Sequence, residues 1–142
     1  MIREIENRRS IRKYKLDEIE RKLIEEIIYS ASLAPSAKNR QPWKFIVYQG
    51  KEKDKLVDVM RHGINSEKTT HELMPEWAFA IPDAENTVRI MQEVPCLIAV
   101  LNTNQHTPFA SIENEKRMVE ICDSLSIGAA IENVAISMWK ST

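Results

Sequence analysis

A short polar segment, residues 35–43, constrains the chain more than any other feature. It reads Pro-Ser-Ala-Lys-Asn-Arg-Gln-Pro-Trp and separates a helical pattern from a strand pattern. Its two prolines fix their own φ angles and push the preceding residues toward extended geometry, so we expect a rigid, shaped loop. Loops held in shape between regular elements are frequent binding sites. Taken alone, the segment is equally consistent with a connector whose polar side chains face water.

The patterns on each side of this loop predict the elements that it joins. Apolar residues recur at helical spacing over residues 19–34, with charged residues on the other face. Asp17 followed by Glu20 resembles a capping box at the start of that helix. The aromatic and β-branched run 44–48 predicts a strand.

The middle of the chain has weaker patterns. Residues 52–61 predict a short helix that Gly63 ends, and residues 85–92 predict one or two helical turns. The stretch 64–83 has no period, and we interpret it as an irregular excursion or lid. Residues 95–101 form a continuous apolar run, which is typical of a central strand covered on both faces. We expect one domain with one core.

The last segment, residues 115–139, has the length and pattern of a long helix. Gly128 stands there among small residues, although glycine costs a helix about 1 kcal/mol relative to alanine. Small residues at this place indicate close approach of another helix or of a ligand, and tight packing of a buried helix is the more frequent reason. The face that we expect to be buried carries Met118, Ile121, Cys122, Leu125 and Ala129.

Charge and composition disfavour several classes of function. The 20 basic and 21 acidic residues leave a formal charge of -1, so no global field favours nucleic acid or a membrane surface. We find neither a secretory signal at the N-terminus nor an apolar run that approaches a membrane span. Cys96 and Cys122 lie in apolar stretches without CxxC spacing, as expected of buried thiols in a reducing compartment. We therefore expect a cytoplasmic protein without nucleic-acid or membrane partners.

A second candidate site is the basic run near the N-terminus. Arginine forks and a hydroxyl suit a phosphate, which offers several acceptor oxygens and close to two negative charges. Basic runs as short as this one are more often solvated surface. The run contains Arg8, Arg9, Ser10, Arg12 and Lys13.

Other constellations are missing from the sequence. The chain has neither GxGxxG nor GxxxxGK[ST], and its three glycines do not suffice for a glycine-rich phosphate loop. His62, His71 and His106 are far apart without ligand spacing, so we expect no metal site. No Ser or Cys is placed near a His by sequence, which leaves covalent catalysis without support. The remaining features fit a phosphorylated cofactor better than a set of catalytic side chains.

Three motifs together resemble the FMN-dependent nitroreductase superfamily of flavoproteins. They are Arg-Arg-Ser-Ile-Arg at 8–12, Ala-Pro-Ser-Ala-Lys-Asn-Arg-Gln-Pro-Trp at 34–43, and Ser-Ile-Gly-Ala-Ala-Ile-Glu-Asn at 126–133, in family order and spacing. The resemblance implies an α+β fold with a mostly antiparallel central sheet flanked by helices. It also implies an intertwined homodimer whose two flavin sites lie at the subunit interface.

The resemblance further implies roles for individual residues. In the family the first motif grips the phosphate and ribityl chain of FMN, and the second motif lies against the flavin from the partner subunit. The implied reaction is ping-pong hydride transfer from NAD(P)H through flavin N5 to a nitroaromatic, quinone or similar acceptor. No catalytic side chain is implied, because the flavin carries the chemistry. The implied cofactor-binding residues are Arg8, Arg9, Ser10, Arg12, Pro35, Ser36, Ala37, Asn39 and Gln41.

The resemblance covers this chain but not the whole family domain. We expect a single domain over 1–142 that lacks the family's C-terminal strand and the late cation of its phosphate clamp. A missing strand exposes a pairing edge, and a missing cation weakens binding of a dianion. The alternative to an oxidoreductase is therefore a truncated, non-catalytic dimeric remnant with weak or no flavin binding. The sequence sets neither the physiological acceptor nor the choice between NADH and NADPH.

Overall fold

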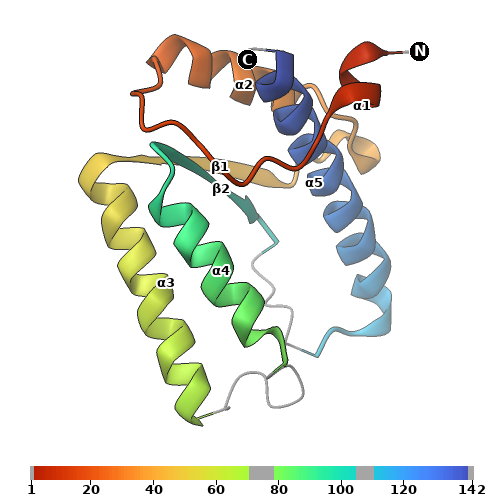
Figure 1. Ribbon diagram of the computed structural model, residues 1–142. Helices are drawn as coiled ribbons and strands as arrows, with labels where there is room; N and C mark the ends of the chain where they lie inside the picture. The colour runs from red at the N-terminus through yellow and green to blue at the C-terminus, as the bar shows by residue number, and fades with distance from the viewer. Residues whose placement is uncertain (1, 71–78, 105–110, 141–142) are drawn as a thin grey trace. The chain divides into compact units, whose positions relative to one another are not determined.

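A computed structural model describes residues 2–70, 79–104 and 111–140. The chain divides into two compact units: the first holds residues up to Ser10, 19–46 and from 99 onward, and the second holds 11–18 and 47–98. The elements are α1 (Arg3–Asn7), α2 (Arg21–Ser32), the 3-10 turn η1 (Ala37–Asn39), β1 (Trp43–Gln49), α3 (Gly50–Thr70), α4 (Ile81–Gln92), β2 (Cys96–Asn102) and α5 (Asn114–Lys140) (Figure 1).

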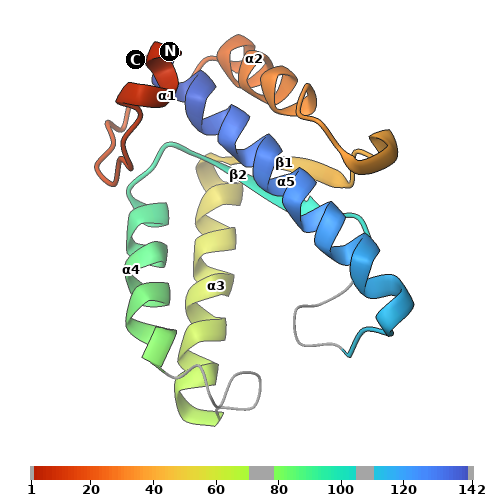
Figure 2. The ribbon, with the colours of Figure 1, turned by 90° about the vertical axis from the view of Figure 1, so that its right-hand side faces the viewer.

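The first unit is built on the packing of α2 against α5 (Figure 2). Ala31 of α2 and Ala130 of α5 are both fully buried, and such small side chains let two helix axes approach closely. The Nδ2 of Asn133 also donates a hydrogen bond to the carbonyl of Ser30 over 3.0 Å. The predicted close approach of another helix is therefore confirmed, but at Ala130: a Cβ added to Gly128 would meet nothing within 4 Å.

Helix α2 confirms the helix predicted over residues 19–34 but begins later than expected. The carbonyl of Glu20 accepts the first two helical hydrogen bonds, from the amides of Leu23 and Ile24 at 3.1 and 3.3 Å. No side chain caps this N-terminus, so the predicted capping box is wrong. A capping box joins positions three residues apart, and Asp17 lies too far before Arg21 to fill its first position.

Helix α5 confirms the long helix predicted at 115–139, but the expected buried face is wrong. Met118, Ile121 and Leu125 are exposed, whereas Asp123, Ser126 and Ala130 are buried. Among the described helices, α5 is the one that is long and apolar enough to cross a membrane by length and composition alone. This property differs from the expectation that no apolar run approaches a membrane span.

The second unit packs α3 against α4. The prediction that Gly63 ends a short helix is wrong, because α3 continues through it to Thr70. A glycine costs a helix about 1 kcal/mol, which the packing of a 21-residue helix overrides. Helix α4 covers 12 residues, rather than one or two turns, and carries Pro82 in its first turn, where the missing amide proton has no intrahelical partner to lose.

These two helices also correct the interpretation of residues 64–83 as a lid. Residues 64–70 belong to α3 and residues 81–83 to α4, while 71–78 lie outside the described residues. The Nζ of Lys68 lies 2.7 Å from Oε1 of Glu85, which joins the two helices near their connected ends. The absence of a simple period in this stretch reflects a helix end, a connection and a helix start in succession.

Strands β1 and β2 form a two-stranded sheet within the described residues. The pairing is antiparallel, since Thr103, just after β2, donates its amide proton to the carbonyl of Pro42, just before β1, over 2.9 Å. Both predicted strands are confirmed. In the described part of the chain β2 has one neighbour and is mostly half-buried, so its prediction as a central, fully covered strand is wrong there. The architecture is α+β, as expected.

Candidate functional site

The loop that opens the second motif has an unusual backbone. Lys38, Asn39 and Gln41 have φ angles of 54, 53 and 49°. In this left-handed region the Cβ of a non-glycine residue crowds the carbonyl oxygen, at a cost of roughly 1–3 kcal/mol per residue. Such a conformation persists only where surrounding contacts enforce it. The prediction of a shaped loop is confirmed.

Ser36 stabilises the loop through hydrogen bonds to other residues of the loop. Its carbonyl accepts a hydrogen bond from the amide of Asn39 at 2.9 Å, and its Oγ accepts one from the amide of Gln41 at 3.0 Å. These bonds tie the two ends of the turn to one residue. Pro35 and the side chain of Asn39 are exposed, and that side chain makes no hydrogen bond with the described residues. The loop therefore presents a free amide on a fixed backbone.

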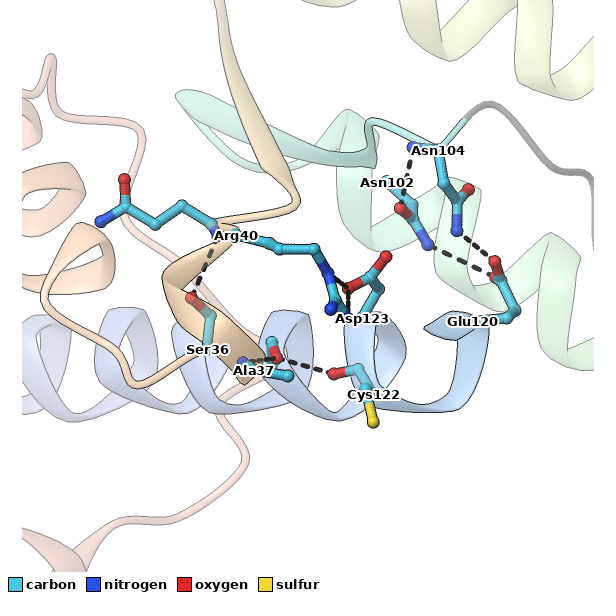
Figure 3. Close-up of polar contacts among 10 residues, drawn as sticks. Ser36, Ala37, Arg40, Asn102, Asn104, Glu120, Cys122 and Asp123 are labelled. Atoms are coloured by element: carbon cyan, nitrogen blue, oxygen red, sulfur yellow. Dashed lines mark hydrogen bonds and ion pairs between the residues drawn. The ribbon is translucent and has the colours of Figure 1, made fainter. Parts of the chain in front are cut away.

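Two residues of α5, Asp123 and Ser126, also bind this loop (Figure 3). Nη2 and Nε of Arg40 donate hydrogen bonds to Oδ1 of Asp123 at 2.7 and 3.0 Å. The Asp123 side chain is only 5% exposed and that of Arg40 31%. One turn along α5, Oγ of Ser126 accepts the Ala37 amide at 3.4 Å and donates to the carbonyl of Cys122 at 2.6 Å.

The polar stripe of α5 extends one turn further back to Glu120. Oε1 of Glu120 accepts a hydrogen bond from Nδ2 of Asn102 at 3.4 Å, and Oε2 accepts one from Nδ2 of Asn104 (Figure 3). The stripe Glu120, Asp123 and Ser126 thus contacts both the segment that leads into β1 and the segment that leaves β2. Side chains spaced by three residues share one face of a helix, so a single face of α5 holds both segments.

The basic N-terminal run meets α5 elsewhere. Nε of Arg8 lies 2.9 Å from Oε1 of Glu132, with the two side chains 35% and 50% exposed. Nη1 of Arg9 donates to the carbonyls of Glu6 and Arg8 at 3.0 and 2.8 Å. Ser10 is exposed and its hydroxyl is accessible. Arg12 is also exposed and belongs to the second unit.

The two predicted groups of binding residues therefore share one helix but not one side of it. The loop attaches at Asp123 and Ser126, and Arg8 attaches at Glu132. The nine residues from Asp123 to Glu132 correspond to about 13.5 Å along the axis and a rotation of roughly 180° around it. Within the first unit, α5 separates Arg8 from the loop of Pro35, Ser36, Ala37, Asn39 and Gln41.

Sequence reasoning missed the residues that hold the site in place. Arg40 lies in the polar loop and Asp123 in the predicted C-terminal helix, and the sequence patterns do not connect the two residues. A signal was present: Asp123 is the single charged residue in the stretch 121–131. A lone carboxylate in an uncharged helical stretch calls for a partner, because burial of an unpaired charge is costly. The identity of that partner, 83 residues away, was not readable from the pattern.

Comparison with solved structures identifies proteins that share this fold. The chain resembles a solved nitroreductase-like family protein from Bacillus cereus, with 25% identity, a TM-score of 0.65, and coverage of 97% of this chain and 63% of that one. It also resembles an FMN-dependent nitroreductase from Clostridium difficile, with 26% identity, a TM-score of 0.60, and coverage of 99% and 61%. These similarities define a nitroreductase-like α+β fold.

Sequence comparisons agree. The family model described as "Nitroreductase family" matches residues 5–140, and the chain belongs to this family. A curated protein of Methanothermobacter thermautotrophicus, named "Putative NADH dehydrogenase/NAD(P)H nitroreductase", is 42% identical over 60 residues, which are 42% of this chain and 31% of that protein. A protein of the same name from Archaeoglobus fulgidus is 52% identical over 48 residues, 34% of this chain and 28% of that protein. The chain thus spans less than two thirds of the length of each of these relatives.

Proposed function

We propose that this chain acts as an FMN-dependent NAD(P)H oxidoreductase of the nitroreductase type. The observation that carries the proposal is the loop 35–41, whose strained backbone is held by α5 while Pro35 and the Asn39 amide stay exposed. Strained backbone that the surrounding structure enforces is concentrated at ligand sites. The family match over 5–140 and the FMN-dependent relative from C. difficile indicate which ligand class to test.

The donor groups fit FMN. Arg8 and Arg9 present guanidinium groups and Ser10 a hydroxyl, which together suit a phosphate dianion. The exposed amide of Asn39 can both donate to and accept from a flavin ring edge. We assign FMN binding to Arg8, Arg9, Ser10, Arg12, Pro35, Ser36, Ala37, Asn39 and Gln41. FMN bound there would supply the hydride chemistry between NAD(P)H and a nitroaromatic, quinone or similar acceptor.

In this proposal the protein contributes binding and orientation. The guanidinium groups would neutralise the phosphate, and the fixed loop backbone would set the orientation of the ring. Ser36 has a second role beside the one that the resemblance implies, because its hydroxyl oxygen accepts the Gln41 amide and closes the loop. Its hydroxyl proton is still available for a ligand, since that contact uses only a lone pair of the oxygen.

We also propose that the active form is a homodimer in which each site combines the basic run of one chain with the loop of the other. The contacts at Asp123 and Glu132 lie roughly 180° apart around α5, which favours their serving different sites. Met118, Ile121 and Leu125 leave an apolar face of α5 exposed, as expected of a helix that packs against a second subunit. Cys96 and Cys122 are free thiols, which agrees with a cytoplasmic location.

A flavin titration combined with a size measurement tests this function. Purified, flavin-free chain is titrated with FMN while flavin fluorescence and visible absorbance are recorded, and its mass is measured by light scattering. We expect saturable binding by a dimer, NADH or NADPH oxidation by the complex, and at least tenfold weaker binding for Arg8→Gln. Saturable binding without turnover would support the non-catalytic alternative. Absence of any binding would remove the FMN assignment.

A further inference from the structure

We propose that Asp123 is a positioning residue: through Arg40 it fixes the loop 36–41 in the conformation that contacts the flavin. This inference rests on the proposed function for the identity of the ligand. The contact between Asp123 and the loop itself is a feature of the structure. Neither residue belongs to the set that the family resemblance marks as touching the cofactor.

The first step of the argument is the strain in the loop. Lys38, Asn39 and Gln41 all have positive φ angles, so the free segment would relax toward other backbone conformations. The bonds from Ser36 close the turn, but both ends of those bonds lie in the loop itself. They shape the loop without fixing its orientation on the protein. An attachment to a rigid element has to supply that orientation.

The second step is the identity of that attachment. Arg40 lies between the two last positive-φ residues, and both of its recorded bonds reach the same oxygen of Asp123. The carboxylate is almost completely buried, so losing the guanidinium would leave an unpaired buried charge, which is costly. The weaker 3.4 Å contact of the Ala37 amide with Ser126 adds a second point on the same face of α5.

The third step excludes a purely local role for this ion pair. Exposed ion pairs contribute little, and most of those on this chain join residues three or four positions apart in one helix. The Arg40–Asp123 pair instead joins residues 83 positions apart, and its carboxylate is shielded from water. Because the pair attaches the loop to α5, the position of the helix determines the position of the loop. Loss of the pair should therefore free the loop more than it destabilises the helix.

The test uses proteolysis of the ligand-free chain. Trypsin cleaves after Lys38 in the middle of the loop, and mass spectrometry follows the rate at that bond against cleavage after Lys15. We expect Asp123→Asn to raise the relative rate at least fivefold. Glu115→Gln is the matched control, because it removes one exposed carboxylate from the same helix, and we expect no change. Urea unfolding of each variant checks that the fold is retained.

The ligand readout separates positioning from folding. We expect the dissociation constant of FMN to rise about tenfold in Asp123→Asn and in Arg40→Gln. Arg40→Lys keeps a cation for Asp123 and should recover most of that loss, which a general folding defect would not allow. The double variant Arg40→Gln/Asp123→Asn leaves no unpaired buried charge, and it should bind FMN no more weakly than either single variant, because all three lose the same contact.

Two results would overturn the proposal. Equal cleavage rates after Lys38 in wild type and Asp123→Asn would show that the pair does not hold the loop, whether or not FMN binds. Faster cleavage together with an unchanged FMN dissociation constant would show that loop order has no role in binding. If wild type itself does not bind FMN, the proposed function fails, and the cleavage rates still decide whether Asp123 fixes the loop.

Discussion

Replacement of Glu132 by glutamine should tighten FMN binding, although it removes a contact of the candidate site. Oε1 of Glu132 lies 2.9 Å from Nε of Arg8, one of the proposed phosphate ligands. With the two side chains 35% and 50% exposed, solvent screens the pair, and such pairs are worth about 0–1 kcal/mol. Its loss should therefore change folding stability little, while Arg8 becomes available to an anion.

The electrostatic gain can be worked from this geometry. A phosphate on the free side of the guanidinium would lie roughly 6 Å from the carboxylate, where two unit charges in water repel by about 0.7 kcal/mol and a dianion by about twice that. Salt screening reduces this value. We therefore expect Glu132→Gln to lower the FMN dissociation constant by about threefold to tenfold, since 1.4 kcal/mol corresponds to a factor of ten.

The assay is a fluorescence titration with FMN at two ionic strengths, beside Arg8→Gln as the opposite perturbation. Arg8→Gln removes the cation and should weaken binding at least tenfold, and the difference between the two variants should shrink as salt rises. Riboflavin, which has no phosphate, should respond to neither substitution. Weaker FMN binding in Glu132→Gln would refute the reasoning, because it would mean that the carboxylate orients Arg8 rather than competing for it.

Three further predictions concern stability. Ala130→Leu should lower the free energy of unfolding by about 1–3 kcal/mol, because the fully buried site has no room for the larger side chain. Gly128→Ala should raise it by about 0.5–1 kcal/mol, because the added Cβ meets nothing and alanine favours the helix. Urea unfolding measures both changes. Lys53→Met should cost about 2–4 kcal/mol because the buried ammonium bonds two carbonyls at and just after the end of α4, and the exposed Lys51→Met should be near neutral. Desolvation by burial raises the pKa of Cys96. The free energy of unfolding of wild type should therefore fall relative to that of Cys96→Ala only as the pH rises above about 9.

The sign of the pH effect follows from proton binding. A raised pKa means that the folded chain holds the thiol proton at a pH where the unfolded chain has released it, so the unfolded state binds fewer protons and stability falls as pH rises. A difference that grows in favour of wild type above pH 9 would contradict the burial of Cys96. Equal losses for Lys53→Met and Lys51→Met would contradict the bonds to the α4 end, and a neutral Ala130→Leu would contradict the packing of α2 on α5.

Three elements were predictable from sequence. Helix α2 is predicted by its period, strand β1 by its aromatic and β-branched residues, and helix α5 by its length and apolar content, and all three are confirmed. Errors arose where a single residue was given too much weight. Gly63 does not end α3, since the propensity of one residue is smaller than the packing of a long helix. Asp17 does not cap α2, since a cap requires the chain direction to place the side chain over the first turn.

The face of α5 that packs was not predictable from periodicity. The pattern correctly finds an apolar stripe with Met118, Ile121 and Leu125, but that stripe is exposed in the single chain. The packed face instead carries Asp123 and Ser126, whose partners come from a loop more than 80 positions earlier. Hydrophobic patterning identifies surfaces that avoid water, and it does not say which segment covers them. The sequence identifies the loop as a candidate site, and it does not identify the residues of α5 that anchor the loop.

One rigid element thus holds both groups of candidate binding residues in each chain. α5 holds the loop 36–41 through Asp123 and Ser126 and contacts Arg8 through Glu132. Because a helix rises about 1.5 Å per residue without adjustable joints, the spacing of these contacts is set by their separation in sequence. Insertion of a residue between positions 126 and 132 would rotate one group by about 100° relative to the other. The geometry of the site therefore depends on the register of α5 as much as on the residues that would touch the ligand.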